Sequence, residues 1–138
     1  MMNQKNIMLI LSILIFFIVE GCNNKYPFKV PYNMASGYVI GRERCNEDVS
    51  KDYWLIEIVS SASAIQQYGD TLTLNGVKYT NAIKATGLSE SLKKVGEKVA
   101  IDFNIQGTAT LTMGCSVDTP KRYQLKVAEV INSGRASF

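Results

Sequence analysis

The sequence contains no histidine, and this absence excludes several kinds of chemistry. Ser/His/Asp catalysis, Cys/His catalysis, imidazole zinc sites and histidine pH switches all require that side chain. The chain has three cysteines, and no two of them form a Cys-x-x-Cys motif. Its charge surplus is also small, because 15 basic and 12 acidic side chains in 138 residues leave a net charge of +3. A surplus of this size does not favour a nucleic-acid partner, and the length fits one small domain.

The first 21 residues are typical of a signal peptide. Lys5 precedes an apolar run from Ile7 to Val19. A helix that spans a membrane permanently needs about 20 apolar residues, so this run is too short for that role. We therefore expect residues 1–21 to be removed as a leader.

The residues that follow the apolar run, Val19-Glu20-Gly21-Cys22, resemble the bacterial lipobox. Glu20 departs from that pattern, which usually has a small or uncharged residue at this position. An ordinary secretory leader is the alternative, but the usual small-x-small cleavage site is absent. The resemblance implies that Cys22 receives lipid and anchors the domain in a bacterial cell envelope, at the outer membrane and facing the periplasm.

The other two cysteines form an even pair in an exported chain. Cys45 and Cys115 therefore predict a disulfide, with α-carbons within about 7 Å of each other. A nucleophilic thiolate or a metal ligand pair is the alternative, but neither an activating histidine nor further soft ligands are present. Because Cys115 shares its alternation with Leu111 and Met113, we expect the bond to be largely buried.

The mature chain divides into a tether, a domain and a short tail. Residues 22–35 contain Pro27 and Pro31 without a helical period, which indicates a spacer. Residues 36–133 carry the β-strand patterns, and residues 134–138 form the tail.

Seven stretches of the domain are rich in β-forming residues or alternate apolar with polar side chains. We expect strands over 37–45, 53–59, 72–74, 77–79, 97–105, 108–115 and 123–131. Gly37 and Gly41 predict bends or bulges in the first strand, and a slip of phase at Val130 predicts a bulge in the last.

Connections between these strands are also predicted. Asn75-Gly76 favours a type I′ turn that pairs Leu72 with Tyr79 and Leu74 with Val77. A short helix is expected within 88–95, with Ser89 as its cap and Gly96 as its end. Gln106-Gly107 fits a second two-residue turn.

These elements predict a mainly β fold: a small barrel of five to seven strands with one short helix. The chain resembles the oligonucleotide/oligosaccharide-binding (OB) barrel of small bacterial lipoproteins. The resemblance rests on Gly37-to-Cys45, Trp54-Leu55-Ile56, Tyr79-x-Asn81, Gly87-Leu88-x-x-x-Leu92-x-x-x-Gly96 and Cys115. It spans 37–131 but involves scaffold residues, so it implies a fold and no activity. A β-sandwich and an eight-stranded up-and-down barrel, as in lipoprotein lysozyme inhibitors, are the competing folds.

Charged residues form three candidate sites, each with a simpler structural interpretation. Six basic residues fit a solvated face better than a nucleic-acid groove: Lys93, Lys94, Lys98, Lys121, Arg122 and Lys126. Three acidic residues fit a polar turn better than a calcium loop: Glu47, Asp48 and Asp52. Three strand carboxylates show no sign of the separated pKa values that glycoside hydrolysis requires: Glu43, Glu57 and Asp102.

Aromatic side chains supply the remaining candidate site. Trp54 is the single tryptophan, and its place on the most apolar strand favours a core anchor. Trp54 and Tyr53 are the candidate ligand surface if this region stacks against a sugar. We expect no catalytic residue, no cofactor and no metal site.

The sequence therefore predicts a lipid-anchored envelope protein without catalytic activity. Its expected partners are the membrane, through Cys22, and an envelope protein or glycan. Two alternatives remain: an inhibitor of an exogenous hydrolase such as lysozyme, and an oligosaccharide-binding module.

Overall fold

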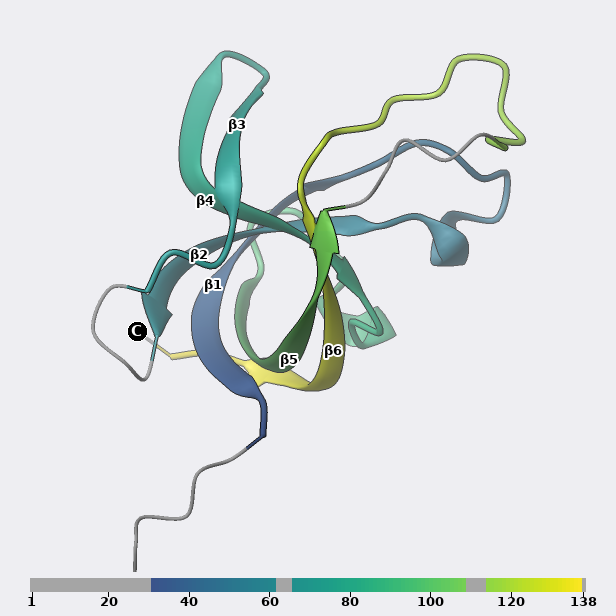
Figure 1. Ribbon diagram of the computed structural model, residues 1–138. Coiled ribbons are helices and arrows are strands. Elements are labelled where there is room, and N and C mark those ends of the chain that lie inside the picture. The colour runs from purple at the N-terminus through teal and green to yellow at the C-terminus, as the bar shows by residue number, and fades with distance from the viewer. Residues whose placement is uncertain (1–30, 62–65, 109–113, 138) are drawn as a thin grey trace, which may run out of the picture. The chain divides into compact units, whose positions relative to one another are not determined.

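The computed structural model describes residues 31–61, 66–108 and 114–137 (Figure 1). The predicted leader, Cys22 and most of the predicted tether lie outside the described residues, as do Leu111 and Met113. Within the described part of the chain, no helix is long and apolar enough to cross a membrane.

The described domain is mainly β, as predicted. Six strands carry the fold: β1 (Asn33–Arg42), β2 (Trp54–Ser61), β3 (Asp70–Leu74), β4 (Val77–Thr86), β5 (Lys98–Thr108) and β6 (Lys126–Arg135). Two single 3₁₀ turns interrupt them: η2 (Val49–Lys51) and η3 (Glu90–Leu92).

The strands form one mixed sheet in the order β2-β1-β5-β6-β4-β3. Because β2 also pairs with β4, the pairing passes through five strands and returns to its start. The neighbours are antiparallel except β4 and β6, which run parallel (Figure 1). A parallel pair rules out an up-and-down arrangement, in which every neighbouring pair is antiparallel.

Strand β1 bends where its glycines were predicted to bend it. Its register against β2 shifts between Ser36 and Gly37 and again between Val39 and Gly41. A Cβ atom at Gly37 would lie only 2.1 Å from the carbonyl oxygen of Glu57. Glycine is required there because the two backbones approach too closely for any side chain.

The two faces of the sheet bury separate apolar clusters. The larger cluster contains the alternating residues of β2 and β5, including Trp54, Ile56 and Ile58, as predicted. The smaller cluster lies on the opposite face of β2 and β4 and contains Leu55, Leu72, Leu74, Ala82 and Leu125. The start of β2 is buried on both faces, so Trp54, Leu55 and Ile56 form a continuous apolar run in the sequence.

The β3–β4 hairpin has the predicted register. Leu72 pairs with Tyr79 and Leu74 pairs with Val77, while the turn residues Asn75 and Gly76 have φ values of 51° and 81°. Figure 1 shows the hairpin projecting from the rest of the sheet. Its leucines are buried, but Val77 at the tip is 52% exposed.

The predicted helix is a single turn, η3. Ser89 precedes it without capping it, because its Oγ lies 2.9 Å from Oγ of Ser133 instead. The turn ends at Leu92 with Lys93 as its C-cap, so the prediction that Gly96 ends the helix was wrong. Gly96 lies in the turn that follows, at φ 87°.

Four predicted strand limits were wrong. β1 begins at Asn33 and ends at Arg42, where a strand over 37–45 was predicted. β6 begins at Lys126 and ends at Arg135, where a strand over 123–131 was predicted. Pairing with β5 extends both strands: Asn33 pairs with Phe103, and Arg135 pairs with Val99.

The predicted turn at Gln106-Gly107 was also wrong. Strand β5 continues through both residues to Thr108 and pairs with β6, with Gln106 as an extra residue between two paired positions. A second shift leaves Ile131 as an extra residue in β6 next to Val130, which confirms the predicted bulge. Cys115 was predicted to lie on a strand, but it lies in an irregular segment between β5 and β6.

The turn of the hairpin generates a stability prediction. Gly76→Val places a β-branched residue at positive φ and should destabilise the domain by about 1–2 kcal/mol. We expect the melting temperature to fall by several degrees in a calorimetric scan. Gly134→Val is the matched control, because Gly134 lies in β6 without positive φ and with open space around it. Equal melting temperatures for the two variants would contradict the assigned turn.

Candidate functional site

A fully buried ion pair lies where three segments of the domain meet. Lys84 Nζ, on β4, lies 2.6 Å from Oε1 of Glu43, which follows β1, and both side chains are 0% exposed. The Lys84 ammonium also lies 5.5 Å from the centre of the Tyr53 ring. Lys84 shares a face of β4 with Ala82, since Ile83 and Ala85 point into the larger cluster.

Glu43 connects this pair to the segment before β6. Its Oε1 accepts a hydrogen bond of 2.7 Å from the backbone N–H of Tyr123, while its own N–H donates to the carbonyl of Tyr53. Its second oxygen, Oε2, is buried without a hydrogen-bond partner among the described residues. Burial raises the pKa of the Tyr123 phenol because it disfavours the charged phenolate, and the negative charge of Glu43 raises this pKa further by repelling the phenolate.

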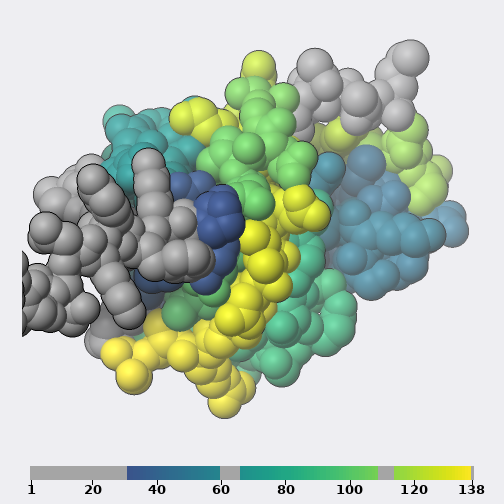
Figure 2. Space-filling model, turned by 60° about the horizontal axis from the view of Figure 1, so that its bottom comes forward, coloured from purple at the N-terminus to yellow at the C-terminus, as the bar shows by residue number. Residues whose placement is uncertain are grey.

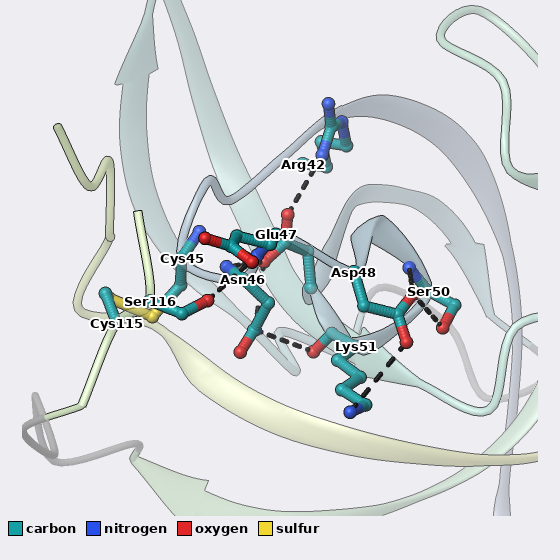
Figure 3. A network of polar contacts seen from close by, with 10 residues as sticks. Arg42, Cys45, Asn46, Glu47, Asp48, Ser50, Lys51, Cys115 and Ser116 are labelled. Carbon is teal, nitrogen blue, oxygen red and sulfur yellow. Dashed lines mark hydrogen bonds and ion pairs between the residues drawn. A yellow bond between two sulfur atoms is a disulfide. The ribbon is translucent and has the colours of Figure 1, made fainter. Parts of the chain in front are cut away.

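A second carboxylate organises the loop of residues 45–52. Asp52 accepts hydrogen bonds from the backbone N–H groups of Cys45 and Asn46 and forms an ion pair of 2.9 Å with Arg42. Figure 3 labels Arg42, Cys45 and Asn46. Asp48 accepts from the N–H and Oγ of Ser50, and these bonds lower the pKa of its carboxyl. Both carboxylates therefore help to hold the backbone of the loop in its conformation. Across the described ranges, no three acidic or cysteine side chains come together as a metal-binding group.

The two cysteines of the domain are joined as predicted. Cys45 and Cys115 form a disulfide with α-carbons 4.5 Å apart (Figure 3). Backbone hydrogen bonds flank it, since Ser116 donates to Cys45 and Arg44 exchanges two bonds with Lys121. The bond is half-buried and not largely buried, because Cys115 lies in an irregular segment at the surface.

A pocket of about 260 Å³ opens beside the disulfide. Loop 45–52, blue in Figure 2, and the yellow-green segment that follows residue 113 lie side by side there. The lining consists of Glu43, Cys45, Asn46, Lys51, Asp52, Tyr53, Thr86, Gly114 and Arg122.

Only one of the two candidate aromatic residues faces this pocket. Tyr53 is half-buried and lines it. Trp54 is 8% exposed and belongs to the larger cluster, so it is a core anchor and supplies no stacking surface. The difference arises because Trp54 is the first residue of β2 and its side chain lies in the larger cluster, whereas Tyr53 precedes the strand.

Four of the remaining charged candidates have partners of their own. Glu57 accepts hydrogen bonds from the N–H groups of Thr80 and Asn81, and Asp102 accepts one from Asn132. Among the basic residues, Lys93 pairs with Glu90, and Lys126 lies 4.0 Å from Asp70. The three strand carboxylates are therefore not assembled into one site.

Lys84 is the functional candidate that sequence reasoning missed. It lies between Ile83 and Ala85 in a strand whose buried residues run 82–85 without alternation, so periodicity gives no sign of a buried cation. No protein-family model, curated protein or solved structure matches this chain. The buried pair, the disulfide and the pocket are the features from which a function can be inferred.

The buried pair predicts a large and asymmetric loss of stability. Lys84→Met should cost about 3–5 kcal/mol, because it leaves the Glu43 carboxylate buried without its cation. Adding Glu43→Gln should recover much of that loss, since the amide oxygen can still accept from Tyr123. Urea unfolding measures both values. Lys51→Met removes an exposed pair with Asp48 and serves as the control that leaves the midpoint unchanged.

The disulfide predicts a specific chemical result. Digestion of the exported protein without reductant should give one peptide pair that links Cys45 to Cys115, and mass spectrometry should find no thiol in this domain that alkylates. Removing the bond should destabilise the domain by about 2–5 kcal/mol. Two alkylated cysteines in the folded, exported protein would contradict this assignment.

Proposed function

We propose that this chain is an exported, lipid-anchored protein of a bacterial cell envelope that binds a partner and performs no catalysis. The leader pattern of residues 1–21 and the lipobox resemblance at Cys22 support its export and anchoring. The observation that carries the proposal is the Cys45–Cys115 disulfide, because such bonds persist in oxidising compartments outside the cytosol.

We also infer that the ring of strands is an OB-like barrel. Strands β1, β2, β4, β6 and β5 follow one another in the order of pairing, and β4 and β6 form the one parallel pair of that ring. The η3 turn lies between β4 and β5, where the OB barrel has its helix. Such barrels present loops around one end for binding, and here loop 45–52 and the pocket occupy the end of β1.

The state of the carboxylates supports a binding role over a catalytic one. Glu43 and Asp52 each have an ion-pair partner, and Glu57 accepts two backbone hydrogen bonds. A general acid or nucleophile needs a carboxyl that is exposed to substrate and has a pKa tuned to its role. These three groups are instead occupied in holding the structure.

An inhibitor of an exogenous hydrolase such as lysozyme is the second candidate function. The β3–β4 hairpin supports it, because it projects from the sheet (Figure 1) and its strand β3 is held by the buried Leu72 and Leu74. A rigid projecting loop is the shape that enters an enzyme cleft with little loss of conformational entropy. Exposed Asn75 and Lys78 would make the first polar contacts.

Anchoring is tested by labelling cells that express the full chain with palmitate. Wild-type protein should take up label and sediment with membranes. Cys22→Ser should lose the label and appear in the soluble fraction or as unprocessed precursor. Asn23→Ser is the matched control, because it changes the neighbouring residue and leaves the acceptor sulfur in place. Label that persists in Cys22→Ser would overturn the proposed anchoring.

A further inference from the structure

We propose that Lys84 and Glu43 condense after folding into an amide bond between their side chains, which joins β4 covalently to the segment after β1. The reacting groups are the ammonium and the carboxylate of the buried ion pair, whose Nζ and Oε1 atoms lie 2.6 Å apart. This modification goes beyond the proposed function, because it needs neither lipid on Cys22 nor a binding partner.

The ionic form of the pair leaves two buried polar atoms without a hydrogen bond. Among the described residues, neither Oε2 of Glu43 nor Nζ of Lys84 has a hydrogen-bond partner, since the contact between Nζ and Oε1 lacks hydrogen-bond geometry. A buried polar atom without a partner costs free energy. Condensation removes Oε2 as water, so one of these two atoms leaves the protein.

Complete burial also favours the amide over the two charges. Both side chains are fully buried, and the Tyr53 ring lies 5.5 Å from Nζ. Two charges removed from water lose their solvation, whereas an amide carries no net charge. Bulk water, which hydrolyses amides, is excluded from the pair. The water released has an exit, because Glu43 lines the pocket beside the disulfide.

The reaction balances without an oxidant, a reductant or a co-reactant. The Lys84 ammonium passes one proton to Oε2 of the Glu43 carboxylate, and the electron pair of Nζ then forms a bond to Cδ. The backbone N–H of Tyr123, 2.7 Å from Oε1, stabilises the negative charge that develops on that oxygen. A second proton moves from Nζ to Oε2, the Cδ–Oε2 bond breaks, and water leaves. Oε1 remains as the amide carbonyl, and Nζ keeps one proton.

The fold holds the two reactants together before they react. Lys84 is paired on both sides of β4, with Leu55 of β2 and Val127 of β6. The backbone N–H of Glu43 donates to the carbonyl of Tyr53. Two groups that are held in contact react as one molecule, which removes the entropy cost of bringing them together.

Burial distinguishes this pair from other lysine–carboxylate pairs of the domain. At least one side chain is exposed to water in each of three such pairs: Lys51–Asp48, Lys93–Glu90 and Lys126–Asp70. Water solvates those charges and competes with the amine for the carboxyl carbon. We therefore expect the amide at Lys84 and not at these three lysines.

Mass spectrometry of two matched variants of the full chain tests this inference. Lys84→Arg keeps the positive charge but removes the amine, and Lys51→Arg makes the same substitution at an exposed lysine. The two variants have the same calculated mass and carry the same lipid. After a reductant has opened the disulfide, Lys51→Arg should be lighter by about 18 Da, the mass of the water that the amine of Lys84 displaces from Glu43.

Tryptic digestion of the wild-type chain locates the bond and does not depend on the folding of a variant. An amide on Lys84 blocks cleavage after that residue. Trypsin should therefore release a branched peptide, in which residues 43–44 are attached to Lys84 within residues 79–93.

Three outcomes would overturn the inference: equal masses for Lys84→Arg and Lys51→Arg, complete tryptic cleavage after Lys84 in the wild-type chain, or a loss of water located in another peptide. Palmitate labelling at Cys22 depends on none of these results. Failure of the amide bond and failure of the proposed anchoring are therefore distinguished by separate measurements.

Discussion

The buried Glu43–Lys84 ion pair is the interaction on which the arrangement of β4, the end of β1 and the segment before β6 depends. It joins the residue after β1 to Lys84 near the end of β4, and Glu43 extends the link to Tyr123 before β6. Two charges without solvent exposure are expensive, so a pair of apolar residues would serve stability as well or better. The pair makes the relative positions of its segments more specific, because an ion pair with hydrogen bonds allows fewer arrangements than apolar packing does. The position of loop 45–52 relative to β4 follows from it.

Local patterns in the sequence predicted the parts of the fold that local physics determines. The Asn75-Gly76 turn and the apolar residues on both sides of it require the same register, so the hairpin was predicted pair by pair. Gly37 marked a bulge because only glycine allows the backbone of β2 to approach. Gln106-Gly107 misled for a related reason: a glycine at positive φ suits a two-residue turn and a bulge equally well, and pairing with β6 decides between them.

The candidate site could be predicted only in part, because it is assembled from distant segments. The disulfide was predicted from the count of cysteines and the leader, without knowledge of strand order. The burial of Lys84 was not, since a lysine between Ile83 and Ala85 resembles an exposed strand residue until its neighbour Glu43 is placed. Trp54 and Tyr53 are adjacent in the sequence, yet β2 turns one into the core and leaves the other beside the pocket.

Different interactions hold the apolar core and the polar pocket of this small domain, so the chain can form both. The larger apolar cluster is built from buried residues of the strands, and none of them lines the pocket. The pocket wall is instead secured by covalent and ionic links: Cys45–Cys115, Glu43–Lys84 and Asp52–Arg42. Because Asn46 and Thr86 line the pocket and lie outside the core, substitutions at these two positions should change the lining of the pocket while the packing of the larger cluster is kept.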